Sequence, residues 1–274
     1  MIRFLSFFSS AGMDDDPMLY LFQWQHFLYV ALGIISFFVI LHLMKDKPKK
    51  TRDRFITILL VLMLLLKYGG EIIFVSEYYR FDELVSPHTH PLIDFQTIIS
   101  FQLCGVNNVL LPIVIWFNIK PMKDFVYTTS IIGGLAVLLY PVGVLYGEPL
   151  VLTFVMIRTL IVHFLLIFIP LFLIITGEFT LEGKNWKNTL YGSLLMAAWS
   201  LFGNVVIYPG ANYMYMMENP FYGGPIPLLN QLPNGYHLFL QIPILILGFV
   251  LVYQLIFFIQ RHRFQPNMKK NQLG

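Results

Sequence analysis

Seven apolar stretches, each long enough to cross a bilayer, dominate this 274-residue chain. A membrane-spanning helix needs about 20 mostly apolar residues. Stretches of this kind lie at about 22–44, 54–76, 92–117, 125–146, 151–176, 188–208 and 236–260. Because backbone polar groups in lipid must be satisfied within their own segment, the pattern predicts an all-α membrane protein. We expect a seven-transmembrane-helix bundle over residues 22–260, preceded by an extracytoplasmic segment (1–21) and followed by a basic cytoplasmic tail (261–274).

The distribution of charge predicts how this bundle is oriented. Only 12% of the residues are charged, against about 25% in soluble domains, so we expect no separate soluble domain. Lys and Arg concentrate in alternate connections, at 45–54, 120–123, 184–187 and 261–270. By the positive-inside rule these segments face the cytoplasm and the N-terminus lies outside. We therefore predict a multi-pass protein of the cell membrane, with no nucleic-acid partner because no basic surface domain is present.

Two chemically reactive side chains share one predicted depth in the membrane. Cys104 is the only cysteine, which excludes an internal disulfide and a Cys-rich metal site. It lies twelve residues into the third stretch, and His163 lies twelve residues into the fifth. At about 1.5 Å per residue, both lie roughly 18 Å below the outer boundary. A histidine beside a thiol can accept its proton and turn the sulfur into a strong nucleophile.

The third stretch carries a polar stripe around this cysteine. The residues recur at helical spacing: Thr97, Ser100, Cys104, Asn107 and Asn108. Asn107 and Asn108 are candidates to orient the imidazole or to stabilise an oxyanion. The alternative interpretation is structural: a buried cysteine acts as a small apolar residue, asparagines join helices, and a histidine bonds a backbone carbonyl.

Other polar positions inside the spans allow two interpretations each. Lys67 and Glu71 are either a neutralising pair, or Glu71 is a carboxylate at the outer mouth of a cavity. Arg158 either reaches the headgroup region or binds a lipid phosphate or carboxylate. Ser200 and Asn204 face the bundle, where Asn204 is a candidate substrate contact or interhelical glue. His88 and His90 form an isolated pair in an outer loop, which predicts no metal site, and no cofactor is implied.

The longest predicted connection, 209–235, contains no Lys or Arg and is rich in Pro and Tyr. Aromatic residues concentrate at the membrane interface, and loops of this length are commonly functional. We expect it to cap the outer mouth of the bundle.

The motifs resemble the YwaF-like family of bacterial integral membrane proteins, which is related to the vertebrate transmembrane protein 164 acyltransferase. The resemblance rests on Gln25-His26-Phe27, on Leu103-Cys104, on Val162-His163-Phe164 and on Gly210-Ala211-Asn212-Tyr213. Where the bacterial pattern has Pro-Leu-His-Leu or similar before the cysteine, this chain has Ser100-Phe101-Gln102-Leu103. The resemblance implies seven helices, Cys104 as the acyl-accepting nucleophile and His163 as the base. Asn212 and Tyr213, in the most specific block, are candidate substrate-binding residues.

Three classes of function therefore compete. The first is a lipid acyltransferase, or a hydrolase if water is the acceptor, acting on a membrane phospholipid or lysophospholipid through a Cys104 thioester. The second is a non-catalytic membrane transport or solute- and lipid-binding component using the same polar cavity. The absence of an internal repeat argues against an inverted-repeat transporter. The third is a heptahelical sensor, which the short cytoplasmic loops disfavour.

Overall fold

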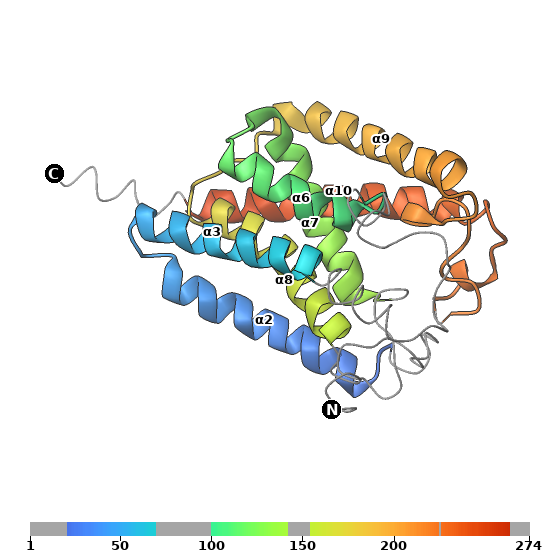
Figure 1. Ribbon diagram of the computed structural model, residues 1–274, viewed down its shortest axis with the longest axis horizontal. Helices are drawn as coiled ribbons and strands as arrows, with labels where there is room; N and C mark the ends of the chain where they lie inside the picture. The colour runs from blue at the N-terminus through green and yellow to red at the C-terminus, as the bar shows by residue number, and fades with distance from the viewer. Residues whose placement is uncertain (1–20, 70–99, 142–153, 225, 264–274) are drawn as a thin grey trace.

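The computed structural model describes residues 21–69, 100–141, 154–224 and 226–263 (Figure 1). These residues contain α-helices and short 3-10 and π turns, and no strand occurs among them. The α-helices are α2 (Trp24–Met44), α3 (Lys49–Leu64), α6 (Leu103–Trp116), α7 (Lys120–Leu139), α8 (Phe154–Ile175), α9 (Trp186–Phe202) and α10 (Leu238–Arg263). One π turn, η2 (Leu65–Gly69), extends α3, and another, η4 (Gly203–Ile207), extends α9.

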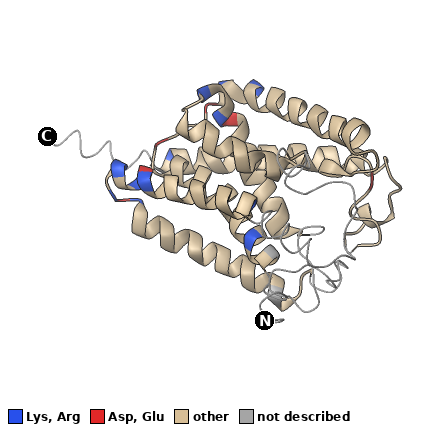
Figure 2. Cartoon of the chain, viewed as in Figure 1, with Lys and Arg blue, Asp and Glu red and all other residues tan. Residues whose placement is uncertain are grey.

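Long-range polar contacts bring the basic segments together at one end of the bundle (Figure 2). Arg52, near the start of α3, donates to Glu178, just after α8, at 2.7 Å. Asn188 in the first turn of α9 donates to Asp124 in the first turn of α7 at 3.0 Å. Gln260 near the end of α10 exchanges two hydrogen bonds with the backbone of Leu181. Consecutive helices therefore run in alternating directions, as short connections in a helical bundle require.

The core is built around α7 and α8. Phe168 and Phe172 of α8 are fully buried; both meet the Phe55 ring of α3 edge to face, and their own rings are tilted against each other. By contrast, α2 and α10 expose Leu, Ile, Val and Phe side chains along most of their length. A soluble protein rarely exposes apolar surface on this scale, whereas a bilayer solvates it without cost. The exposed helices are therefore lipid-facing.

Five described helices are long and apolar enough to span a membrane: those that contain residues 26–44, 120–139, 156–175, 183–207 and 238–262. The predicted second and third spans both continue into residues 70–99, outside the described part of the chain, so the count of seven and the orientation remain predictions. The predicted continuous third span is wrong at one point. Residues 100–102 are not helical, and α6 begins at Leu103, so Cys104 lies in a first helical turn rather than mid-helix.

Candidate functional site

The start of α6 is fixed by two side chains of α9. Trp199 donates its indole N–H to the carbonyl of Ser100 at 3.1 Å, and Ser200 donates its hydroxyl to the carbonyl of Phe101 at 2.6 Å. In a continuous helix these two carbonyls would accept the N–H groups of residues 104 and 105. The Phe101 ring also stacks on Trp199, with the ring centroids 4.8 Å apart. The contacts with α9 therefore stabilise the bend, and α6 begins after it, at Leu103.

Cys104 consequently lies in a first turn whose N–H groups have no carbonyl of the same helix to bond. Val106 is the first residue of α6 whose N–H bonds back to a carbonyl, that of Gln102, at 3.0 Å. The first turn of any helix carries such orphan N–H groups and the positive end of the helix dipole. Both can stabilise negative charge that develops beside the first turn during a reaction. Gly105 makes the bend possible, because a Cβ atom there would lie 2.1 Å from the Ser100 hydroxyl oxygen.

A glycine pair of α7 separates Cys104 from His163. A Cβ atom on Gly133 would lie 3.0 Å from the Cys104 sulfur, so α6 crosses α7 closely at that point. A Cβ atom on Gly134 would lie 2.8 Å from the His163 carbonyl oxygen and 2.6 Å from Ile167 Cγ1, both on α8. Small residues allow membrane helices to approach this closely. The two candidate catalytic residues thus flank the same step of α7, from two different helices.

His163 is buried, and its ring is held by its own helix. Nδ1 lies 2.7 Å from the carbonyl oxygen of Thr159, one turn earlier. A carbonyl only accepts, so Nδ1 carries the proton and the neutral ring keeps its lone pair on Nε2. This is the tautomer that a general base needs at Nε2. In the described part of the chain, no hydrogen bond joins His163 to Cys104.

Asn107 and Asn108 lie one turn below Cys104, and both are buried. Asn107 donates its amide N–H to the Thr129 hydroxyl of α7 at 3.0 Å, and that hydroxyl donates to the Phe125 carbonyl at 2.7 Å. Within the described residues, the amide oxygens of both asparagines and the hydroxyl of neighbouring Ser130 lack a hydrogen-bond partner. Unpaired buried polar atoms are costly, so three of them in one region call for an explanation.

The predicted substrate-binding residues fall into two groups. Arg158 is half-buried on α8, one turn before His163, while Glu71 and the His88–His90 pair lie outside the described residues. Asn204, Asn212 and Tyr213 belong to a second cluster, which the connection after α9 forms.

In this second cluster the side-chain amide of Asn204 makes two hydrogen bonds with the backbone of Tyr213. It donates to the Tyr213 carbonyl at 3.1 Å and accepts the Tyr213 N–H at 2.7 Å. Asn212 accepts the N–H groups of Met217 and Glu218, each at 3.0 Å. These bonds fix the fold of the loop. The side-chain amide oxygens of Asn204 and Asn212 are both bonded to N–H groups of the loop backbone.

The loop from 209 to 235 reaches the start of α6 through Gln102, which immediately precedes the helix. The Gln102 amide oxygen accepts the N–H of Met214, and Gln241 of α10 donates to the Met214 carbonyl at 3.2 Å. The Tyr213 ring packs against Phe101, with centroids 5.2 Å apart. Sequence reasoning named neither Gln102 nor Gln241 as a contact. The departure from the bacterial pattern at Gln102 was the only signal, and it carried no information about a partner 112 residues away.

Two further features escaped sequence reasoning. The Gly133-Gly134 pair was visible as two small residues in an apolar helix, which is a signature of close helix packing. His26, near the start of α2, is buried, and its sequence position gave no sign of this. Its Nδ1 accepts the N–H of Phe22 at 3.1 Å, so Nε2 donates to the Leu138 carbonyl of α7 at 2.9 Å.

Apolar, lipid-facing helices around a buried polar site define a multi-pass integral membrane protein. The chain belongs to the TMEM164 family, whose family model matches residues 21–259. The predicted relationship to the transmembrane protein 164 family is thereby confirmed. No curated protein and no solved structure matches the chain.

Proposed function

We propose that this chain is a membrane-embedded lipid acyltransferase that carries the acyl group on Cys104. The observation that carries the proposal is the position of the thiol. It lies at the positive end of α6, beside the glycine step that His163 flanks from the other side. The motif resemblance to the vertebrate acyltransferase supports this class of activity for a chain of the TMEM164 family. The donor and acceptor would be a phospholipid and a lysophospholipid, which reach the site from the bilayer.

In the first half-reaction His163 Nε2 accepts the proton of the Cys104 thiol, and the sulfur attacks the ester carbonyl carbon of the donor lipid. The tetrahedral intermediate places negative charge on the former carbonyl oxygen. The orphan N–H groups of the first turn of α6 are suited to stabilise that charge. When the intermediate collapses, the C–O bond breaks, the lysolipid alkoxide takes the proton from His163, and a thioester remains.

In the second half-reaction His163 removes the proton from the hydroxyl of the acceptor lysolipid. The new alkoxide attacks the thioester carbonyl, the C–S bond breaks, and the thiolate takes back the proton. With water in place of the lysolipid, the same steps release a fatty acid. Catalytic hydrogen bonds often tighten only when substrate is bound, so the proposal assigns closure of the Cys104–His163 contact to the lipid complex.

An acyl-trapping experiment tests this proposal. Purified protein in detergent is incubated with a phosphatidylcholine that carries an alkyne-tagged acyl chain, and hydroxylamine-sensitive label on the protein is measured over time. We expect label on the wild-type chain and none on Cys104→Ala. Removal of the base in His163→Ala should slow acylation by about 100-fold or more.

His262 supplies the matched control. Its Nδ1 bonds the carbonyl of Phe258, four residues earlier, at 2.8 Å, which is the same local pattern as His163 and Thr159. His262→Ala should therefore leave acylation unchanged. Equal acylation rates in His163→Ala and the wild type would exclude His163 as the base. A thiol-reactive lipophilic probe gives the same comparison independently of the acyl donor.

The buried unpaired oxygens of Asn107 and Asn108 favour one second candidate, a component that binds a lipid or polar solute without covalent chemistry. Such a component would retain the tagged lipid in the wild type and in Cys104→Ala alike. It would form no thioester in either.

A further inference from the structure

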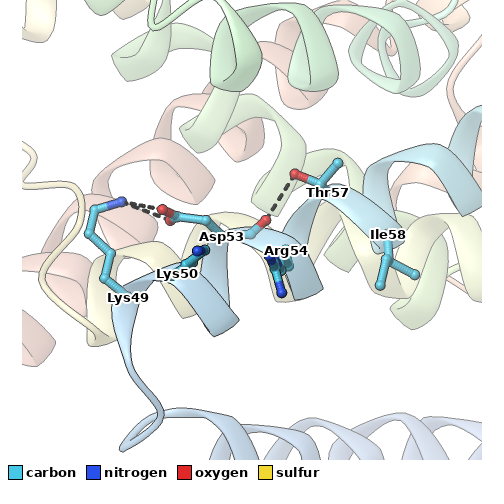
Figure 3. A pocket seen from close by; sticks show the side chains of 6 residues that line it. All are labelled: Lys49, Lys50, Asp53, Arg54, Thr57 and Ile58. Carbon is cyan, nitrogen blue, oxygen red and sulfur yellow. Dashed lines mark hydrogen bonds and ion pairs between the residues drawn. The ribbon is translucent and has the colours of Figure 1, made fainter.

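One face of α3 forms an open pocket of about 640 Å³ at the basic end of the bundle (Figure 3). Its lining residues all come from the first three turns of this helix: Lys49, Lys50, Asp53, Arg54, Thr57 and Ile58. None of them belongs to α6, α7 or α8, which carry the site around Cys104. The pocket is therefore a separate site.

The basic segment before and within α3 divides into cations that are already paired and cations that are not. Arg52 turns inward, where it donates to Glu178 at 2.7 Å and to the carbonyls of Lys45 and Lys47 at 3.3 and 2.9 Å. Lys49 pairs with Asp53 at 2.7 Å. Lys50 and Arg54 have no acidic partner among the described residues, and Figure 3 draws no interaction to either.

The two unpaired cations form an anion-binding arrangement. Lys50 and Arg54 are four residues apart, so they extend from adjacent turns of the same helix face. Like charges at this spacing repel each other, and a bound anion relieves that repulsion. A guanidinium beside an ammonium matches a phosphate group, because the guanidinium can bind two phosphate oxygens at once.

The surface beyond the cations is apolar and identifies the kind of anion. Ile58, on the pocket wall, is 64% exposed, and the exposed apolar residues continue through Val61 and Leu62 of α3 to Leu65 at the start of η2. A soluble phosphate would use the cations and leave this track uncovered. An amphiphile fits both the cations and the apolar track, with its phosphate at Lys50 and Arg54 and its acyl chains along the helix. Clusters of Lys and Arg beside a membrane helix also attract anionic lipids.

We propose that Lys50 and Arg54 bind the phosphate of an anionic phospholipid in the leaflet at the basic end of the bundle. The site holds a resident lipid and does not depend on the chemistry at Cys104.

Native mass spectrometry of the full chain in detergent tests this site. The protein is titrated with phosphatidylglycerol and, separately, with phosphatidylcholine of the same acyl composition. We expect the wild type to prefer phosphatidylglycerol. The preference should fall by about tenfold or more in Lys50→Gln/Arg54→Gln, because each cation near the headgroups contributes to the attraction.

Two control variants make the result specific. Lys184→Gln/Lys187→Gln removes the same charge from another part of the basic end and should keep the preference. Lys50→Arg/Arg54→Lys keeps both charges in the pocket and should also keep it. An unchanged preference in Lys50→Gln/Arg54→Gln would overturn the proposal. Displacement of the phosphatidylglycerol by excess inorganic phosphate would also overturn it, since a soluble anion would then be the ligand.

Discussion

Gly134 brings the backbone of α7 so close to His163 that a single added methyl group would lie 2.8 Å from the His163 carbonyl oxygen. At the preceding residue, the same addition on Gly133 would meet the Cys104 sulfur at 3.0 Å. The glycine pair thus sets the spacing of α6, α7 and α8 around the candidate site. A larger residue at position 133 would displace a side-chain atom, whereas one at position 134 would displace backbone.

Gly134→Ala is expected to destabilise the fold by about 1–3 kcal/mol, because the backbone of α8 and Ile167 cannot easily move away. Gly133→Ala should cost less, since it meets a side-chain atom that can turn. Thermal unfolding in detergent measures both. Gly248→Ala is the control: nothing lies within 4 Å of a Cβ atom there, so we expect no loss and a gain of up to about 1 kcal/mol from helix propensity. Equal loss at all three positions would contradict the close approach.

The hydrogen bond from Asn107 to Thr129 should appear as a coupling free energy between α6 and α7. A double-mutant cycle with Asn107→Ala and Thr129→Val isolates it from the cavity and packing effects of each change. We expect a coupling of about 0.6 kcal/mol, the average for polar contacts between membrane helices. Thr57→Val serves as the control in place of Thr129→Val. Thr57 makes the same hydroxyl bond within its own helix, to Asp53 at 2.9 Å, but is exposed, so its coupling to Asn107 should be zero within error.

Gln102→Leu should loosen the 209–235 loop while leaving the helices intact. It removes the acceptor of the Met214 N–H, a hydrogen bond with a net contribution of about 1 kcal/mol. Hydrogen exchange at Met214 should then accelerate by about fivefold. Gln102→Glu keeps an acceptor at the same place and should restore protection. Gln231→Leu, at an exposed position of the same loop, is the control; a similar acceleration there would assign the effect to hydrophobicity alone.

Arg52→Gln should destabilise the bundle by about 3 kcal/mol, because it removes the charge partner that lies 2.7 Å from Glu178 at a largely buried site and leaves only Lys49, 3.9 Å away. The side chains of Arg52 and Glu178 are only 16% and 12% exposed. The nearby pair of Lys49 and Asp53 is 68% and 49% exposed, so Lys49→Gln should cost no more than about 1 kcal/mol. Unfolding by denaturant in detergent compares the two. Similar losses would mean that burial does not govern the Arg52 pair.

Hydropathy located three of the helices closely, because the requirement for an apolar helical segment acts on each stretch separately. The predicted stretches 22–44, 151–176 and 236–260 correspond closely to α2, α8 and α10. The prediction of a continuous helix in the third stretch was wrong between residues 100 and 102. No Gly or Pro lies there to end a helix, and the bend depends on Trp199 and Ser200, about 100 residues further along the chain.

The sequence by itself determined the class of protein, an all-helical membrane chain, and the identity of its few reactive side chains. Both follow from composition and local hydropathy, which need no partner. Only the tertiary structure decided that Cys104 lies in the first turn of a helix and that a glycine pair separates it from His163. It also decided that Arg52 turns inward, while Lys50 and Arg54 have no acidic partner among the described residues. Each of these depends on contacts between distant segments, and the energy of a contact between two helices is not encoded in either helix alone.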